Sequence, residues 1–158
     1  MKIQLWSIGK PHDSNMKAAI DEFTKRAGNY FQVEWKIIPP LKNAATLSEQ
    51  ELKKKEGELL LSQIDKTDFL VALDERGKTF SSETLAVFIQ QRANESTRRI
   101  IFLIGGAFGL HEAVLKRAGY CWSLSLLTFP HQLVRLILAE QLYRACTIIR
   151  NEKYHHAG

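Results

Sequence analysis

The stretch that decides the fold is IIFLIGGAFGLHE, residues 100–112. It begins as an apolar run that ends at Ile104, passes through Gly105 and Gly106, and becomes helix-like after Gly109. A buried strand followed by a glycine-rich turn and a helix is typical of α/β proteins, and glycines let the backbone approach a ligand closely. The spacing GGxxG supports neither a GxGxxG dinucleotide site nor a Walker-type phosphate loop. A plain turn between strand and helix is the alternative interpretation.

Strands and helices alternate on both sides of this stretch. We expect strands over 2–8, 32–38, 69–74, 99–104 and 121–127, and helices over 13–26, 48–64, 81–94, 110–118 and 130–151, with a tight turn at 75–78. Asp13 or Ser14, Ser48, and Ser81 or Ser82 are the expected N-caps, and Pro130 suits a first helical turn. This alternation predicts an α/β fold with a mostly parallel sheet flanked by helices. A length of 158 residues fits one domain, 1–158.

Composition limits the class of protein. Hydrophobic residues make up 45% of the chain, which is enough for a sizeable core. A formal net charge of +5 favours a negatively charged partner. Cys121 and Cys146 lie in apolar segments without metal-ligand spacing, which predicts reduced core thiols and a cytoplasmic location. No signal peptide is visible, and no stretch approaches the roughly 18 apolar residues of a membrane span, so we expect no membrane partner.

The last predicted helix is apolar around nearly its whole circumference. The residues responsible are Leu133, Val134, Leu136, Ile137, Leu138, Ala139, Leu142, Tyr143, Ala145, Cys146, Ile148 and Ile149. A helix of this kind is normally buried on all sides. A terminal helix on a small domain needs a second subunit for such burial, so the pattern predicts a homodimer.

Several polar residues near the end of the chain are candidates for chemistry. Glu140 and Arg144 are spaced for an i,i+4 ion pair, whereas Arg135 lacks a local partner and is the better candidate for a phosphate contact. His131 lies in the first turn of the helix, where a substrate contact and an ordinary surface or capping role are both open.

Two further segments offer polar groups. Asp74 and Glu75 end a buried strand and are able to accept hydrogen bonds from ribose or amino groups, although a solvated turn would look the same. Tyr154, His155 and His156 end the chain, where an aromatic ring and bases suit RNA contact by stacking and charge, and a frayed terminus is the alternative.

Three stretches carry a family resemblance: LIGGAFGLHE (103–112), SLSLLTFPHQLVRLILAEQLYRA (123–145) and the terminal YH (154–155). The segments MKIQLWSIGK (1–10), KKKEGELLL (53–61) and LDERGK (73–78) match as well. On these motifs the chain resembles the ribosomal large-subunit methyltransferase H family of the SPOUT superfamily. The resemblance runs from Met1 to His155.

The resemblance implies a SPOUT-type domain whose C-terminal part, about 100–150, is tied in a trefoil knot and binds S-adenosyl-L-methionine. It also implies a homodimer that methylates N3 of a pseudouridine in 23S rRNA, within the large subunit or the assembled ribosome. The positions that match the family's cofactor contacts are Leu73, Gly105, Leu124, Ser125, Leu126, Leu127, Thr128 and Phe129.

N3 of a uracil-type ring is a poor nucleophile until it loses its proton, so a base or a cation that stabilises the ring anion should help. Arg135, His131, Tyr154 and His155 are the catalytic candidates, in no settled order, and no metal is needed. Two other functions are weighed against this one. A non-catalytic ribosome-binding or assembly factor would bind RNA without cofactor affinity. An α/β enzyme for another nucleotide is disfavoured because GxGxxG is missing.

Overall fold

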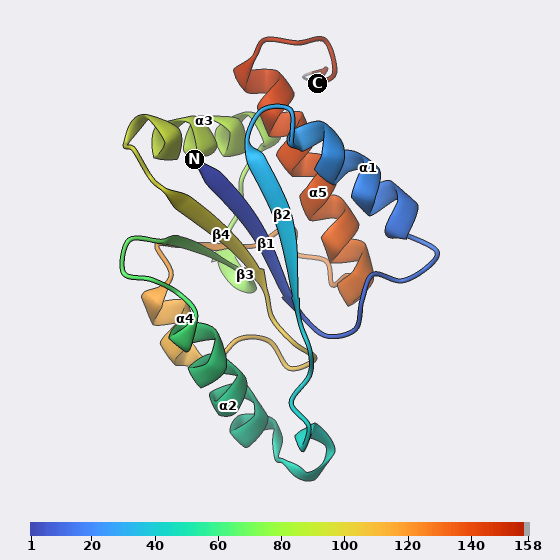
Figure 1. The fold of residues 1–158 in the computed structure, drawn as a ribbon, viewed down its shortest axis with the longest axis vertical. Coiled ribbons are helices and arrows are strands. Elements are labelled where there is room, and N and C mark those ends of the chain that lie inside the picture. The colour runs from blue at the N-terminus through green and yellow to red at the C-terminus, as the bar shows by residue number, and fades with distance from the viewer. Residues whose placement is uncertain (157–158) are drawn as a thin grey trace.

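A computed structural model describes residues 1–156 and contains one five-stranded sheet in the order β2-β1-β4-β3-β5 (Figure 1). Its strands are β1 (Lys2–Ile8), β2 (Gln32–Ile38), β3 (Phe69–Lys78), β4 (Arg99–Ile104) and β5 (Tyr120–Trp122). The helices are α1 (Lys17–Ala27), α2 (Glu49–Ser62), α3 (Ser82–Asn94), α4 (Glu112–Arg117) and α5 (His131–Ile149), with a short 3-10 helix at Ala44–Thr46. Every strand pairing is parallel, which confirms the predicted fold class.

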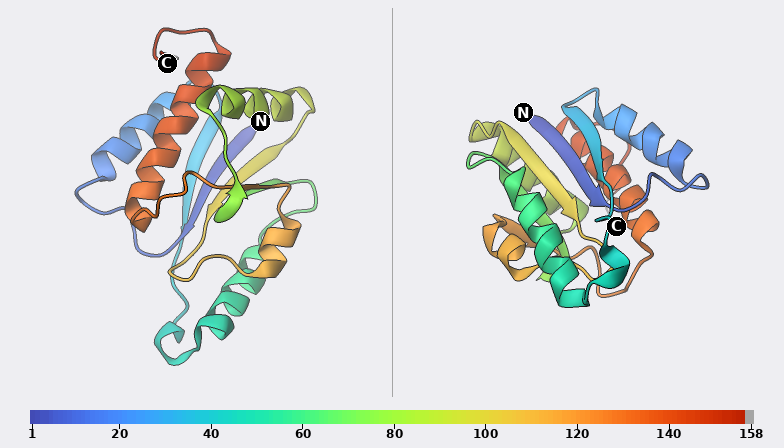
Figure 2. Two further views of the ribbon diagram at one scale, coloured as in Figure 1. Left: turned by 180° about the vertical axis from the view of Figure 1, so that it is seen from behind. Right: turned by 60° about the horizontal axis from the view of Figure 1, so that its bottom comes forward.

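Successive residues of the central strands enter two cores, one on each face of the sheet. In β4, Ile100 and Phe102 belong to the core shared with α1, α3 and α5. Ile101 and Leu103 belong to the core shared with α2 and α4. Figures 1 and 2 show the corresponding layers, with α1 and α5 on one side of the sheet and α2 and α4 on the other. Burial on both faces explains why residues 100–104 are apolar without interruption.

Helix α5 packs against both α1 and α3 on its face of the sheet. Its buried residues are Arg135, Leu138, Ala139, Leu142, Ala145, Cys146 and Thr147. The chain itself therefore covers much of the surface that sequence analysis assigned to a second subunit. A stripe of α5 remains partly exposed and consists of Leu133, Leu136 and Ile137. Only this stripe is left for a second subunit to cover.

The predicted strand at 121–127 is wrong beyond Trp122. The chain leaves the sheet there, after the backbone N–H of Ser123 donates to the carbonyl of Lys78. The predicted turn at 75–78 is also wrong, because β3 continues to Lys78, which pairs with Trp122 across a register shift. Both errors have one cause. Whether each segment forms a strand depends on its pairing with the other, and the two segments are distant in the sequence.

Helix ends differ from the prediction by a few residues. Helix α1 begins at Lys17 with Met16 at the N-cap, and neither Asp13 nor Ser14 caps it, because residues 14–16 form a turn. Helices α4 and α5 are shorter than expected, and Pro130 is the N-cap of α5. The predicted caps of α2 and α3 are confirmed, since the hydroxyl groups of Ser48 and Ser81 each accept a backbone N–H.

Candidate active site

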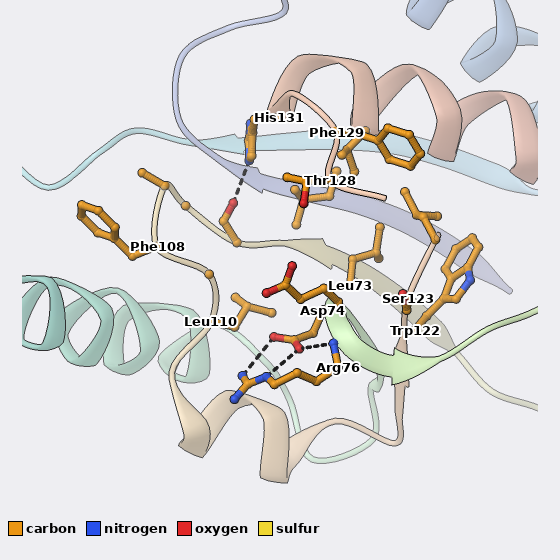
Figure 3. A pocket seen from close by; sticks show the side chains of 18 of the residues that line it. Leu73, Asp74, Arg76, Phe108, Leu110, Trp122, Ser123, Thr128, Phe129 and His131 are labelled. Atoms are coloured by element: carbon orange, nitrogen blue, oxygen red, sulfur yellow. Dashed lines mark hydrogen bonds and ion pairs between the residues drawn. The ribbon is translucent and has the colours of Figure 1, made fainter. Parts of the chain in front are cut away.

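A pocket of about 540 Å³ opens at the carboxyl ends of β3 and β4 (Figure 3). Its walls come from the end of β3, the turn at 104–110, the segment 122–129 and the first turn of α5. Ligands of open α/β sheets bind beyond the carboxyl ends of the strands. Pockets for small molecules typically measure about 300–1,000 Å³, so this one has the size of a cofactor site.

Nearly all of the predicted cofactor residues line this pocket. They are Leu73, Gly105, Leu124, Ser125, Leu127, Thr128 and Phe129. Leu126 does not line it, and its side chain is 96% exposed. The structure thus brings Leu73, Gly105 and the run 124–129 together around one pocket. The side chain of Leu126 is the exception, because it lies on the outer surface.

The segment 123–130 offers backbone groups to a ligand because it belongs to no strand or helix. Two serines shape it. The hydroxyl of Ser123 donates to the carbonyl of Ser125 over 2.9 Å, and the hydroxyl of Ser125 accepts from the N–H of Leu127 over 3.0 Å. Backbone N–H and C=O groups held in this way suit the edge of an adenine ring.

The glycines after β4 are required by close packing of the chain itself. A Cβ atom on Gly105 would lie 2.9 Å from Cγ of Leu110, and one on Gly106 would lie 3.0 Å from both carboxylate oxygens of Glu56. Glu56 is buried, and burial raises the pKa of its carboxyl group. A larger side chain at Gly105 would therefore disturb the turn as well as any ligand beside it.

One wall of the pocket is charged. Asp74, Glu75, Arg76 and Lys53 all line it. Asp74 accepts from the backbone N–H and from Nε of Arg76, over 2.9 and 3.0 Å. Burial acts to raise the pKa of Asp74, but the hydrogen bonds from Arg76 outweigh it and hold the pKa below its ordinary value. These side chains line the pocket, and Glu75 and Arg76 are also exposed to solvent at its rim.

His131 stands at the start of α5 and lines the pocket. Its Nε2 lies 2.7 Å from the carbonyl oxygen of Gly105 (Figure 3). A carbonyl only accepts, so Nε2 carries the proton and Nδ1 carries the lone pair of the neutral ring. Burial lowers the pKa of His131; the bond to Gly105 opposes this shift, and the charge of Arg135 adds to it. Burial therefore favours the neutral form of the His131 ring at the wall of the pocket.

Arg135 is one helical turn further and is completely buried, with 0% exposure. Its Nε donates to the hydroxyl of Ser7 over 3.1 Å, and its Nη1 donates to Nδ1 of His12 over 3.2 Å. Its Nη2 has no hydrogen-bond partner among residues 1–156. Sequence analysis missed Ser7 and His12, and no local pattern marks them, because their link to Arg135 spans most of the chain.

The two tail candidates lie elsewhere. The hydroxyl of Tyr154 donates to Glu140 over 3.0 Å, and His155 lies 2.8 Å from a carboxylate oxygen of Glu83. Neither residue lines the pocket of the same chain. Both are half-buried against α5 and α3, so residues 154–155 are an ordered part of the fold and not a frayed end. Within the described chain, His131 alone among the four catalytic candidates lines the pocket.

Other candidate features can be placed briefly. Cys121 and Cys146 are free, and burial raises the pKa of Cys146 to about 12, as befits a core thiol. Residues 1–156 hold no grouping of three His, Cys, Asp or Glu side chains suited to a metal ion. None of the helices described has the length and hydropathy needed to span a bilayer.

The chain is similar to known methyltransferases in both sequence and fold. A family model described as "Predicted SPOUT methyltransferase" matches residues 1–155. A probable methyltransferase from Bordetella pertussis has a similar fold, with a TM-score of 0.55 over 91% of this chain and 93% of that one, at 12% identity. A probable methylase family protein from Haemophilus influenzae gives a TM-score of 0.53, covering 98% of this chain and 70% of that one, at 13% identity.

Relatives with much higher identity extend over the full length. Proteins named ribosomal RNA large subunit methyltransferase H are 47% identical in Flavobacterium johnsoniae and 49% identical in Christiangramia forsetii, covering 99% of each chain. The protein of that name from Cytophaga hutchinsonii is 47% identical over 99% of this chain and 100% of its own. The chain belongs to the ribosomal large-subunit methyltransferase H family of SPOUT methyltransferases.

Proposed function

We propose that this protein uses S-adenosyl-L-methionine to methylate N3 of a pseudouridine in the 23S rRNA of the large ribosomal subunit. The observation that carries this proposal is the pocket at the ends of β3 and β4, which is lined by Leu73, Gly105 and most of the run 124–129. The names of the full-length relatives support an rRNA substrate. The net charge of +5 suits a polyanion.

The residues of the pocket fit the cofactor. Leu73, Trp122 and Leu124 are apolar surfaces for a flat adenine ring, and the irregular backbone after Ser123 supplies hydrogen-bonding groups for its edge. Asp74 and Glu75 are carboxylates that suit the cofactor's hydroxyl and ammonium groups. When bound, S-adenosylmethionine supplies a methyl group that its positive sulfur already activates.

The protein's own chemical task is to prepare N3 of the target ring. His131 is the best placed of the candidate bases, because it lines the pocket and its neutral ring has a lone pair on Nδ1. In the proposed reaction Nδ1 takes the proton from N3 as the ring attacks, and a bond from Nε2 to Gly105 holds the imidazole in place. Orientation of the two reactants supplies most of the remaining acceleration.

The proposed RNA contacts are made by lysines of α2 near the pocket and by Tyr154 and His155 near the end of the chain. Lys53 lines the pocket and Lys54 and Lys55 are exposed beside it, so α2 offers positive charge near the entrance. Tyr154 and His155 keep their proposed role in binding RNA. Arg135 is buried away from solvent, and its proposed role is therefore to act through His131 and not on a phosphate directly.

We propose further that the protein is a cytoplasmic homodimer with a trefoil knot. Exposed apolar side chains support the dimer: Leu126 is 96% exposed, Leu127 70% and Phe108 44%. For the knot, the support is the path of residues 123–130, which run from β5 at one edge of the sheet, past the end of β4, to α5 near Ser7 of β1.

The decisive experiment is methyl transfer from labelled S-adenosylmethionine to free 23S rRNA, large subunits and whole ribosomes from a strain that lacks the endogenous enzyme. Mapping the label to N3 of one pseudouridine is the expected result. RNA binding without transfer would favour the non-catalytic ribosome factor, and the absence of cofactor affinity in calorimetry would reject the proposal.

A further inference from the structure

Among residues 1–156, the guanidinium of Arg135 is a buried positive charge that forms no ion pair with a carboxylate. It is 0% exposed, its two hydrogen-bond partners are the neutral side chains of Ser7 and His12, and burial alone lowers its pKa. Burying a charge that is not paired with an opposite one is strongly unfavourable. Because burial of this charge destabilises the fold, its place near the pocket indicates a functional role for Arg135.

The position of the guanidinium shows where the charge acts. A Cβ atom built on Gly9 would lie 3.5 Å from Nη2 of Arg135 and 3.9 Å from Cε1 of His131, so the guanidinium and the imidazole both lie beside Gly9. The hydroxyl of Ser7, which accepts from Arg135, is also 3.5 Å from Nε2 of His131. The Ser7 hydroxyl therefore lies between the guanidinium of Arg135 and the ring of His131, and it holds the positive charge near that ring.

His12 reaches Arg135 because the segment between β1 and α1 is fastened to the start of α5. The side chain of Gln132 accepts from the N–H of Asp13 over 2.9 Å and donates to the carbonyl of Pro11 over 3.3 Å. The His12 ring meets the ring of Trp35 edge-on at 4.9 Å. A guanidinium only donates, so Nδ1 of His12 must be an acceptor and the ring must be neutral.

We propose that His12 is a positioning residue for methyl transfer: its Nδ1 holds the Arg135 guanidinium at the Ser7 hydroxyl, which in turn lies beside the ring of His131. The proposal rests on the proposed function for the role of His131. It extends the site to the first elements of the chain, where nothing in the sequence marks a catalytic contribution.

The neighbourhood of His12 makes the arrangement sensitive to its protonation. The pKa of His12 is lowered first by burial and then by Arg135; Asp21 opposes the shift and Lys17 adds slightly to it. A protonated His12 would lose its acceptor and repel the guanidinium. Asparagine offers an acceptor oxygen near the place of Nδ1 and does not titrate, so His12→Asn preserves the contact and His12→Leu removes it.

The first measurement is the pKa of the His131 ring by NMR in the wild type, His12→Leu and His12→Asn. Because Arg135 helps to lower that pKa, His12→Leu should raise it toward the ordinary value of 6.5 and His12→Asn should leave it in place. His111→Asn is the matched control, because His111 only caps α4 and should move nothing. An unchanged His131 pKa in His12→Leu overturns the proposal, whatever the activity.

The second measurement is single-turnover methyl transfer by the same proteins at saturating cofactor. His12→Leu should lower the rate on the order of tenfold, as loss of a group that orients another typically does, with cofactor affinity unchanged. His12→Asn should restore the rate. It should also remove the part of the decrease in rate at acidic pH that comes from protonation of His12. A rate that falls equally in both variants overturns the positioning role. Absence of transfer by the wild type would instead reject the proposed function, while the NMR result would still decide whether His12 positions Arg135.

Discussion

Nε2 of His131 lies 2.7 Å from the carbonyl oxygen of Gly105, so the first turn of α5 is tied directly to the turn that follows β4. This bond joins the two segments that carry the family motifs, and it fixes the imidazole tautomer at the wall of the pocket.

Replacing His131 by glutamine should separate structure from catalysis. The glutamine amide is able to keep a bond to Gly105 but cannot take a proton from N3. General-base catalysis typically contributes about 10²–10⁴-fold, so single-turnover transfer should fall by about a hundredfold or more while S-adenosylmethionine affinity stays within about twofold. Transfer at the wild-type rate would show that His131 is not the base.

Acidification should lower both activity and stability through the histidines. The folded-state pKa values of His12 and His131 lie below the ordinary value of 6.5, so the unfolded chain takes up protons first as the pH falls. The free energy of unfolding should therefore decrease below pH 6.5, by at most about 1.4 kcal/mol per pH unit for each group. Urea unfolding across the pH range measures this slope, and it should flatten in the double variant His12→Asn, His131→Gln. The same slope in both proteins would contradict the assignment.

Filling the pocket should abolish cofactor binding without unfolding the protein. Thr128 is exposed at the pocket wall, so Thr128→Tyr puts an aromatic ring where the ligand sits and strains no core contact. Calorimetry should show affinity reduced at least about tenfold, or 1.4 kcal/mol. Thr79→Tyr is the control, because Thr79 is exposed and does not line the pocket. Equal affinities for the two variants would place the cofactor elsewhere. Gly105 is less suitable for this test, since a Cβ there collides with Leu110.

The stripe of α5 that the chain leaves partly exposed should be covered by a second copy. Light scattering should give twice the chain mass of 18.1 kDa for the wild type. Ile137→Asp would bury an unpaired charge in that interface, which is strongly unfavourable, and should give a monomer. Val87→Asp, on the 56% exposed Val87 of α3, should remain dimeric. A monomeric wild type would refute the dimer.

Deleting residues 153–158 should remove most transfer to ribosomal RNA and leave cofactor affinity unchanged, because Tyr154 and His155 do not line the pocket of their own chain. The melting temperature should fall modestly, since the deletion removes the hydrogen bonds from Tyr154 to Glu140 and from His155 to Glu83. Affinity, melting and transfer are measured on the same protein. A parallel loss of cofactor affinity would show that the tail serves the pocket.

Much of the fold was predictable from the sequence because its signals are local. The uninterrupted apolar run 100–104 indicates a strand buried on both faces, and the alternation of 32–38 matches an edge strand with one exposed face. The caps Ser48 and Ser81 were recognisable because the bonds they make are only three residues away. The motifs around Gly105 and Thr128 indicated most of the pocket wall.

Tertiary structure alone decided how those parts meet. The apolar run after Trp122 has the composition of a strand, but it leaves the sheet and Leu126 is 96% exposed, because β5 ends where its partner β3 ends. Ser7, His12 and Arg135 come together only because parallel pairing sets the end of β1 beside α5. Tyr154, close to Arg135 in sequence, is carried away from the pocket by a helix that rises about 1.5 Å per residue. Hydrophobic periodicity depends on residues that are close in the sequence. A functional site depends on which strand ends lie next to each other, and the strand order of the sheet determines this.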